Sequence, residues 1–219
     1  MGLNTVTLGV LNWGDVYWSR FGERWLAAIV SCDPQPDQVM IATDKPIEGL
    51  PKNVRQVVYE GGFLGVNLLA ELCGTEWLFF SGLDDEVLPH SFREIESEED
   101  AIAFGCQQTG QTTALAFAAG RDAYEVCWQL PYNPMNGGYI FRSQSLVDIP
   151  FRDYIYADEV LFAEWAYFGK KVKFENRVRM LWNRWNGSVS WPANRAGEQQ
   201  AQEFKARLRA GLIQKGVPE

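Results

Sequence analysis

The chain has 219 residues, 47% of them hydrophobic, which is the composition of a folded globular domain and not of a disordered chain. Its 28 acidic and 20 basic residues leave a formal net charge of −8, which disfavours nucleic acid as a partner without excluding a local basic patch. The four cysteines form no CxxC pair, so neither a zinc site nor a disulfide framework is predicted. No signal peptide and no membrane-spanning apolar run is visible, and the predicted location is the cytoplasm.

The first half of the sequence alternates strand and helix patterns. Short apolar runs predict strands at Val6–Leu11, Gln38–Ala42, Val54–Tyr59 and Glu76–Ser81. Helical spacing of apolar residues predicts helices at Phe21–Ser31 and Leu64–Cys73. This alternation predicts an α/β fold with a largely parallel sheet covered by helices.

The second half is less regular. Predicted strands lie at Ala101–Phe104, Thr113–Ala118, Tyr139–Arg142 and Lys171–Phe174. A helix is predicted at Ala157–Phe168, with Gly169 after its last turn as a helix-ending residue. The final stretch, roughly Gly197 to Lys215, predicts an exposed amphipathic helix.

Polar clusters follow three of the predicted strands. Asn12–Asp15, Asp44 and Asp84–Asp85 each come directly after an apolar run. Ligands of parallel α/β sheets bind beyond the carboxyl ends of the strands, so these clusters predict a site at one edge. Adjacent carboxylates such as Asp84 and Asp85 suit Mg²⁺ or Mn²⁺, which prefer oxygen ligands. The alternative is an acidic turn that caps the next helix.

Three further features invite a chemical interpretation. Asp158, at the start of a predicted helix, is placed either as a general base or as an ordinary helix-start residue. The pair Gly137-Gly138 lets a backbone approach a ligand closely, although paired glycines also make simple turns. His90 is the only histidine and is expected at the surface. No GxSxG motif accompanies it, which disfavours a serine hydrolase.

These segments together resemble the family-two inverting glycosyltransferases, which have the GT-A fold, over about residues 5–190. The segment Val39–Asp44 resembles the strand whose final Asp contacts the base, and Asn67 lies in the helix that follows in the family. The strand Trp77–Phe80 resembles the one that leads into the metal-binding DxD motif, with Pro89 four residues after Asp85. In that alignment Gly82 replaces the first Asp of the motif and Asp84 takes the place of the second. A shifted alignment pairs Asp84 with Glu86.

Downstream, Asn136–Ser143 resembles the family's acceptor-side Gly-Gly strand. The segment Ala157–Leu161 resembles the Glu-Asp motif, which implies that Asp158 deprotonates the acceptor hydroxyl, with Glu159 as the alternative. The segment Asn183–Ser190 resembles the closing segment of the family, with Asn186 in place of its His.

The resemblance implies a GT-A-type three-layer α/β/α sandwich with a central, mostly parallel sheet. It implies a single domain with a nucleotide-binding half (about 1–92), an acceptor-binding half (about 93–190) and a C-terminal helical tail (about 191–219). The implied activity is metal-assisted inverting transfer of a sugar from a nucleotide-diphosphate sugar, by default a UDP-sugar, to an acceptor hydroxyl. The acceptor is a glycan, a protein, a lipid-linked sugar or a modified base.

The implied site has one catalytic residue, two metal ligands and a set of donor contacts. The catalytic base is Asp158, and Asp84 and Asp85 hold Mn²⁺ or Mg²⁺. The donor contacts are Asn12, Asp44, Asn67, Asp84, Gly137 and Gly138, with Trp13, Trp182 and Trp185 as candidates for stacking on base or sugar.

Three alternative functions remain open on the sequence. A catalytically silent nucleotide-sugar-binding module is consistent with Gly82 and with the replaced His. A nucleotidyltransferase also uses carboxylates at strand ends, but the segment from Asn12 to Arg20 lacks the Gly-rich, basic character typical of pyrophosphorylases. A structural or interaction protein with the same fold is the third alternative.

Overall fold

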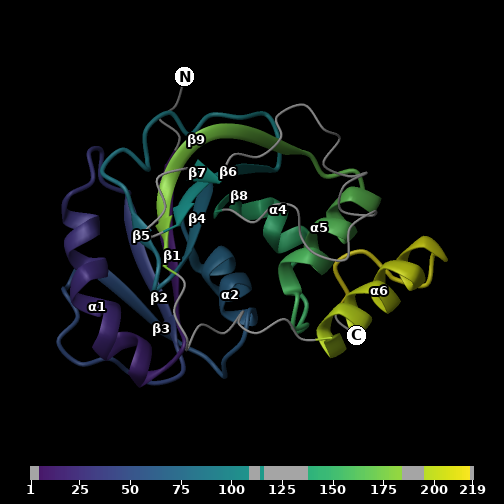
Figure 1. The fold of residues 1–219 in the computed structure, drawn as a ribbon, viewed down its shortest axis with the longest axis horizontal. Coiled ribbons are helices and arrows are strands. Elements are labelled where there is room, and N and C mark those ends of the chain that lie inside the picture. Colours follow the sequence, from purple (N-terminus) through teal and green to yellow (C-terminus); the bar gives the residue numbers. More distant parts are fainter. Residues whose placement is uncertain (1–4, 109–113, 116–137, 184–194, 218–219) are drawn as a thin grey trace.

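The computed structural model describes residues 5–108, 114–115, 138–183 and 195–217, and the statements below concern these residues. Its strands form one curled sheet (Figure 1). The strands are β1 (Val6–Asn12), β2 (Gln38–Thr43), β3 (Val54–Val58), β4 (Trp77–Gly82), β5 (Glu86–Val87), β6 (Ala101–Gln108), β7 (Ala114–Leu115), β8 (Gly138–Arg142) and β9 (Val172–Trp182). Their order in the sheet is β3-β2-β1-β4-β8-β6-β9-β5, with β7 paired to β6.

Most of the sheet is parallel, as predicted. Strands β1 to β4 are mutually parallel where they pair, and β6 is parallel to β9. The strand β8 lies antiparallel between β4 and β6, so β6 and β9 run in the same direction as β1 to β4. The carboxyl ends of these strands therefore meet at one edge, and β8 begins at that edge because its direction is reversed.

Helices cover both faces of the sheet (Figure 1). They are α1 (Asp15–Val30), α2 (Leu64–Leu72), α4 (Ser143–Asp148), α5 (Ala157–Tyr167) and α6 (Arg195–Arg209). The apolar side of α1 packs on one face, whereas α2, α4 and α5 contribute to the core on the other. This arrangement confirms the three-layer α/β/α sandwich. Within the described ranges, no helix is long and apolar enough to cross a membrane.

The central strands are buried on both faces because their residues alternate between the two cores. In β4, Trp77 and Phe79 pack on the α1 side, whereas Leu78 packs on the α2 side, and all three are inaccessible to solvent. The same alternation holds in β1, where Leu8 faces α1 and Leu11 faces α2. A strand covered on both faces reads as a continuous apolar run, which explains why the sequence pattern located these strands.

Two elements extend beyond their predicted bounds. The helix α1 begins at Asp15 and not at Phe21, because Gly14, with a φ of 107°, ends the preceding segment and lets the helix start at once. The strand β9 continues to Trp182, well past the predicted end at Phe174. Polar side chains interrupt the apolar pattern of β9, and one of them, Arg179, is fully buried.

The helix α6 differs from the predicted exposed helix. It ends at Arg209, and Ala201, Phe204 and Leu208 on one side of it are buried in a small core shared with α5. Lys205, also buried, forms an ion pair with the buried Glu159 of α5. The C-terminal helix is therefore packed onto the rest of the fold, through both apolar and charged contacts.

A second buried ion pair fastens the residues that follow α6. The guanidinium of Arg152 donates to both oxygens of Glu164, at 2.7 and 2.8 Å, and the two side chains are 6% and 0% exposed. The same guanidinium donates to the carbonyl oxygens of Gln214 and Val217, at 3.2 and 2.6 Å. Bidentate pairing with additional carbonyl acceptors is the geometry in which a buried charge is well compensated.

Because Glu164 neutralises a buried guanidinium, we expect Glu164→Gln to lower the free energy of unfolding by about 3–5 kcal/mol. The exposed pair between Lys45 and Asp15 serves as the control, and Lys45→Ala should change stability by less than about 1 kcal/mol. Urea unfolding monitored by tryptophan fluorescence measures both. Equal effects of the two substitutions would contradict the structural importance of the buried pair.

Candidate functional site

The predicted polar clusters meet at the carboxyl edge of β2, β1 and β4. Asn12 lies opposite Thr43 in the pairing of β1 with β2, and Leu11 lies opposite Gly82 in the pairing of β1 with β4. Just past β4, the N–H of Leu83 donates to the carbonyl oxygen of Leu11 at 3.1 Å. The three clusters therefore belong to adjacent strands, as the edge hypothesis requires.

Asn12 is 3% exposed and joins the ends of β1 and β2. Its Nδ2 donates to Oγ1 of Thr43 at 3.1 Å, and that hydroxyl donates in turn to the carbonyl oxygen of Lys45 at 2.9 Å. Within the described residues, Oδ1 of Asn12 has no hydrogen-bond partner although it is buried. A buried acceptor without a partner is unfavourable, so this edge has an unused capacity to bind a polar group.

Asp44 follows β2 directly and is exposed. Its carboxylate lies beside Gly14, where an added Cβ would be 4.0 Å from Oδ2. The negative charge of Asp44 also acts on Tyr59. Burial, and then this charge, raise the pKa of the tyrosine hydroxyl to about 12. Tyr59 is thus neutral at physiological pH, and its hydroxyl donates to the carbonyl oxygen of Gly62 at 3.0 Å.

Residues Gly82 to Asp85 form a tight turn at the end of β4. The N–H of Asp85 donates to the carbonyl oxygen of Gly82 at 3.2 Å, which closes the turn. A Cβ placed on Gly82 would be 2.7 Å from Oδ1 of Asp84 and 3.4 Å from Oδ2 of Asp85. Both carboxylates therefore converge on Gly82, the position at which a side chain is missing.

The two carboxylates oppose each other electrostatically. Burial, and then the negative charge of Asp84, raise the pKa of Asp85 well above its ordinary value, although Arg24 and backbone N–H groups act in the opposite direction. Asp84 itself is only 8% exposed. A cation between the two carboxylates would remove this repulsion.

The next acidic residue, Glu86, is engaged elsewhere. It forms a 3.2 Å ion pair with Nε of Arg24 on α1. Among the described residues, no group of three or more His, Cys, Asp or Glu side chains is arranged to hold a metal ion. Asp84 and Asp85 nevertheless fit Mg²⁺ or Mn²⁺, because these ions commonly take one or two protein carboxylates and complete their shell with phosphate oxygens and water.

Two residues that the sequence analysis gave no role contact this turn. Nδ2 of Asn183, just past β9, donates to the carbonyl oxygen of Asp84 at 2.6 Å, and its backbone N–H donates to Oδ1 of Asp85 at 3.2 Å. Nη2 of Arg24 donates to the same carbonyl oxygen of Asp84 at 3.1 Å. The predicted strand ends at Phe174, so the sequence did not show that Asn183 directly follows a strand, and nothing local distinguishes Arg24.

Of the two predicted glycine contacts, Gly138 is the one that the structure describes, and Gly137 lies outside the described residues. Gly138 begins β8 and is packed against β6, where an added Cβ would lie 2.0 Å from Cζ of Phe104. A glycine is thus required here by packing. Because Tyr139 pairs with Phe80, Gly138 lies near the end of β4, at the same edge as the acidic turn.

Asn67 is engaged in a structural contact. Its Nδ2 donates to the carbonyl oxygen of Phe151, and its Oδ1 accepts the N–H of Phe151, both at 2.8 Å. This reciprocal pair fixes α2 to the segment that precedes α5. These hydrogen bonds give the Asn67 side chain a structural role, and its contact with a nucleotide stays a prediction.

Asp158 lies in the first turn of α5, where a carboxylate interacts favourably with the helix dipole. The residues just after α5 meet the starts of β6 and β9, since the N–H of Lys171 donates to Asp100 at 2.8 Å and Ala101 pairs with Val172. Along α5, the ring of Phe162 lies 4.8 Å from Tyr139 near the start of β8, and that of Trp165 lies 5.6 Å from Phe141 near its end. The first turn of α5 therefore points toward the edge where β1, β2 and β4 end. Asp158 accepts the N–H of Glu159 at 2.9 Å through Oδ1.

Glu159, the alternative base, is held by the buried Lys205. Burial raises the pKa of Glu159 although the ammonium of Lys205 opposes that shift. A carboxylate that is 3% exposed and paired with a cation is poorly placed to meet an acceptor. Of the two acidic residues, Asp158 is the better candidate.

A cavity of about 540 Å³ lies between the start of α2, the segment that precedes α5, and α6. Its accessible lining is mixed, with the carboxylates of Asp153 and Glu203 beside Leu64 and Tyr154. Asp153 approaches Gly62, just before α2, where an added Cβ would be 3.5 Å from Oδ1. The cavity is thus on the α2 side, close to the edge where the strands end.

Two of the three candidates for stacking, Trp13 and Trp182, lie among the described residues. Trp13 is half-buried and its ring meets Phe63 edge-on at 5.5 Å, while Trp182 packs against the α1-side core. Trp185 and Asn186 lie outside the described residues. His90 is exposed, as expected, and its Nε2 lies 3.1 Å from the carbonyl oxygen of Val178.

Comparison with solved structures places this architecture among the GT-A folds. No protein-family model and no curated protein matches the sequence. Residues 1–349 of S. aureus TarS, solved with UDP-GlcNAc, superpose with a TM-score of 0.71 at 12% identity, covering 97% of this chain and 68% of that one. The mannosyltransferase PcManGT from Pyrobaculum calidifontis, solved with GDP-Man and Mn²⁺, gives 0.58 at 14% identity, covering 94% and 74%.

A mycobacterial protein gives a TM-score of 0.62 at 14% identity and covers 96% of this chain and 76% of its own. Identities in this range establish the fold and leave the activity to be argued from the site. The chain therefore has a GT-A-type fold, which confirms the fold that the sequence resemblance implied.

Both carboxylates converge on Gly82, so Gly82→Ala should displace the Asp84 side chain. On the metal assignment that the sequence resemblance implies, we expect this to weaken Mn²⁺ binding in the presence of UDP by about tenfold. Electron paramagnetic resonance of free Mn²⁺ measures this. Gly74→Ala at the opposite end of the sheet is the matched control, because its Cβ would make only a 3.4 Å contact with the flexible Gln38. Unchanged affinity in Gly82→Ala would show that Asp84 does not reach the ion from its position here.

The raised pKa of Asp85 predicts a pH-dependent gain in stability for Asp85→Asn. In the parent, the unfolded chain releases the Asp85 proton at a lower pH than the folded protein does, so stability falls as pH rises from the ordinary pKa toward the raised one. Without metal, Asp85→Asn should be more stable by about 0.5–2 kcal/mol at pH 7. The difference should disappear below about pH 4. Denaturant titrations at both pH values test this, and a variant less stable than the parent at pH 7 would contradict it.

Proposed function

We propose that the protein is a glycosyltransferase that moves a sugar from a nucleotide-diphosphate sugar, by default a UDP-sugar, to an acceptor hydroxyl. The observation that carries the proposal is the convergence of Asp84 and Asp85 on Gly82, at the carboxyl edge of a GT-A-type sheet. Open α/β sheets bind their ligands at this edge. The neighbouring Asn12 and Asp44 supply polar contacts for the nucleotide.

Asp84 and Asp85 would hold Mn²⁺ or Mg²⁺, which when bound neutralises charge on the donor diphosphate. The two carboxylates repel each other in a partly buried turn, so a bound cation would be stabilised further because it removes that repulsion. Asn12, whose buried Oδ1 lacks a described partner, would accept a hydrogen bond from the base or ribose. Asp44, exposed beside Gly14, is placed to accept a second one.

Asp158 acts as the general base in this mechanism. It accepts the proton of the acceptor hydroxyl while the oxygen forms a bond to the anomeric carbon and the diphosphate leaves from the opposite side. A single displacement of this kind inverts the anomeric centre. The role of Lys205 is to hold Glu159, so that one carboxylate of the adjacent pair is neutralised by an ion pair and the other serves as base.

The acceptor is assigned to the side of α5 and α6. The cavity of about 540 Å³ beside α2 lies near the start of α5 and has both polar and aromatic walls. Sites that bind sugars combine such side chains, which hydrogen-bond to hydroxyl groups and pack on the apolar face of the ring. This makes a hydroxyl-rich acceptor the expected class.

The proposed assignment of Asp158 is tested by Asp158→Asn, which keeps the shape of the side chain and removes the base. We expect the transfer rate to fall by about 10²–10⁴-fold while UDP and Mn²⁺ bind as in the parent. UDP release from a panel of UDP-sugars and acceptors measures transfer, and calorimetry measures UDP binding. Asp84→Asn is the comparison variant, because it should weaken UDP binding as well.

The outcomes separate the competing functions. Equal loss of binding and turnover in Asp158→Asn would argue against a base. A parent protein that binds UDP with Mn²⁺ and releases no UDP with any acceptor would be a silent binding module, which the two-carboxylate turn also permits. Release of pyrophosphate from a nucleoside triphosphate and a sugar phosphate would identify a nucleotidyltransferase.

A further inference from the structure

We propose that Asn183 and Arg24 are positioning residues that hold the acidic turn Gly82–Asp85 in the conformation able to bind a divalent cation. The inference rests on the proposed function, since it assigns the metal to Asp84 and Asp85. It goes beyond it by naming two residues, from elements far apart in the sequence, on which that site depends.

Asn183 contacts the turn twice. Its side-chain Nδ2 donates to the carbonyl oxygen of Asp84 at 2.6 Å, and its backbone N–H donates to Oδ1 of Asp85 at 3.2 Å. The side chain is 7% exposed, so water does not easily replace it. The first bond fixes the peptide group between the two aspartates, and the second fixes one carboxylate directly.

Arg24 contacts the same peptide group. Its Nη2 donates to the carbonyl oxygen of Asp84 at 3.1 Å, while its Nε pairs with Glu86 at 3.2 Å. One guanidinium therefore binds both Asp84 and Glu86, the residues on either side of Asp85. It also keeps Glu86 directed toward α1, so Asp84 and Asp85 are the acidic residues of this turn that are left to face a cation.

The location of Asn183 is set by β9. The end of β9 pairs with β5, where Leu181 lies opposite Glu86 and Met180 opposite Val87. The strand is also tied to the segment that follows β5. The buried Arg179 donates to the carbonyl oxygens of Ser91 and Arg93, at 2.5 and 2.8 Å.

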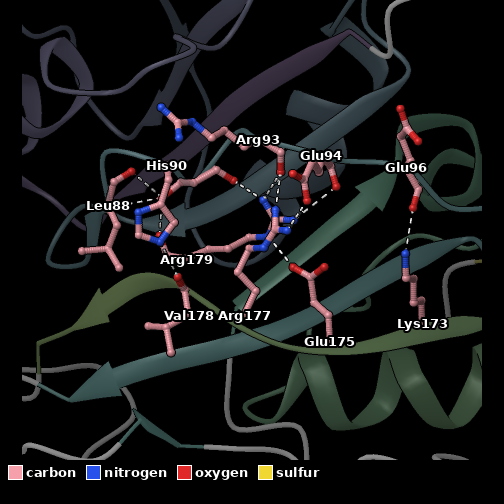
Figure 2. Close-up of polar contacts among 11 residues, drawn as sticks. Leu88, His90, Arg93, Glu94, Glu96, Lys173, Glu175, Arg177, Val178 and Arg179 are labelled. Atoms are coloured by element: carbon pink, nitrogen blue, oxygen red, sulfur yellow. Dashed lines mark hydrogen bonds and ion pairs between the residues drawn. The ribbon is translucent and has the colours of Figure 1, made fainter.

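Figure 2 shows this connection between β9 and residues 88–96. The guanidinium groups of Arg177 and Arg179 meet at the backbone of Arg93 and Glu94, where Arg177 also pairs with the Glu94 carboxylate. Glu94 has a φ of 53°, so its backbone is turned into a conformation that L-residues rarely adopt. These contacts attach β9, from whose end Asn183 reaches the turn, to residues 88–96.

The physical reason for such support is the repulsion within the turn. Two neighbouring carboxylates that converge on Gly82 separate unless the backbone prevents it, and a single rotation of the peptide group between Asp84 and Asp85 would redirect both. Two donors on one carbonyl oxygen prevent that rotation. Residues that orient metal ligands in this way typically affect metal affinity by about 10–100-fold.

The experiment measures Mn²⁺ binding in the presence of UDP for Asn183→Ala, Arg24→Lys and the double variant, by electron paramagnetic resonance. We expect Asn183→Ala to weaken binding by about tenfold, to raise the donor KM and to leave kcat within about threefold. The melting temperature without metal should change little, whereas its increase on adding Mn²⁺ and UDP should shrink. Arg24→Lys keeps the charge but not the two-pronged contact, and it should also weaken binding.

Because both side chains act on one carbonyl oxygen, the double variant should lose less than the product of the single effects. Asn53→Ala, an exposed asparagine before β3, is the matched control and should bind like the parent. If the parent binds Mn²⁺ with UDP and Asp84→Asn does not, but both positioning variants bind normally, the inference is overturned and the proposed function stands. If the parent does not bind Mn²⁺ with UDP, both the inference and the proposed function are overturned. Should Asn183→Ala not fold, Arg24→Lys decides, because Arg24 is 45% exposed on a surface helix.

Discussion

The repulsion between two carboxylates on consecutive residues is the constraint around which this edge of the molecule is organised. Asp84 and Asp85 converge on Gly82, where any side chain would collide with Asp84. Hydrogen bonds from Asn183 and Arg24 hold the turn closed against that repulsion. A protein does not keep such an arrangement for stability, since it raises the free energy of the folded state at neutral pH. Ionisable groups with strongly shifted pKa values are concentrated at functional sites, which supports the proposal that this turn has a role in binding.

The strands of the first half of the chain could be located from sequence patterns. The full extent of β9, in the second half, depends on contacts between distant residues that no sequence pattern shows. Strands such as β4, buried on both faces, show as apolar runs flanked by turns, and the polar residues after them show the ligand edge. The predicted strand stops short of the end of β9 because polar residues, from Glu175 to Arg179, interrupt the apolar pattern. That arginine is buried because the nearby Glu175 pairs with it and because carbonyl oxygens 88 and 86 positions earlier in the chain accept from it. The distant acceptors show in no local pattern.

The candidate site divides in the same way. Asp84, Asp85, Asn12 and Asp44 could be placed at one edge because each follows a strand of a parallel sheet. The partners of other polar residues could not be foreseen from the chain. The side chain of Asn67 forms two hydrogen bonds with the backbone of Phe151. On the buried side of the C-terminal helix, Lys205 forms an ion pair with Glu159. In each of these cases the environment is decided by pairing across distant segments, which residue type and spacing do not encode.

The attachment of the acidic turn to the end of β9 has a consequence for how the protein acquires its shape. Asp84 and Asn183 are 99 residues apart in the chain. During synthesis, the first four strands and α1 emerge and can pair with one another well before β9 exists, since contacts between nearby segments form first and distant pairings later. A nascent chain at that stage carries both carboxylates but lacks the hydrogen bonds that Asn183 donates to the turn. On the proposed metal assignment, the ability to hold a cation is therefore gained late in folding, once β9 has joined the sheet.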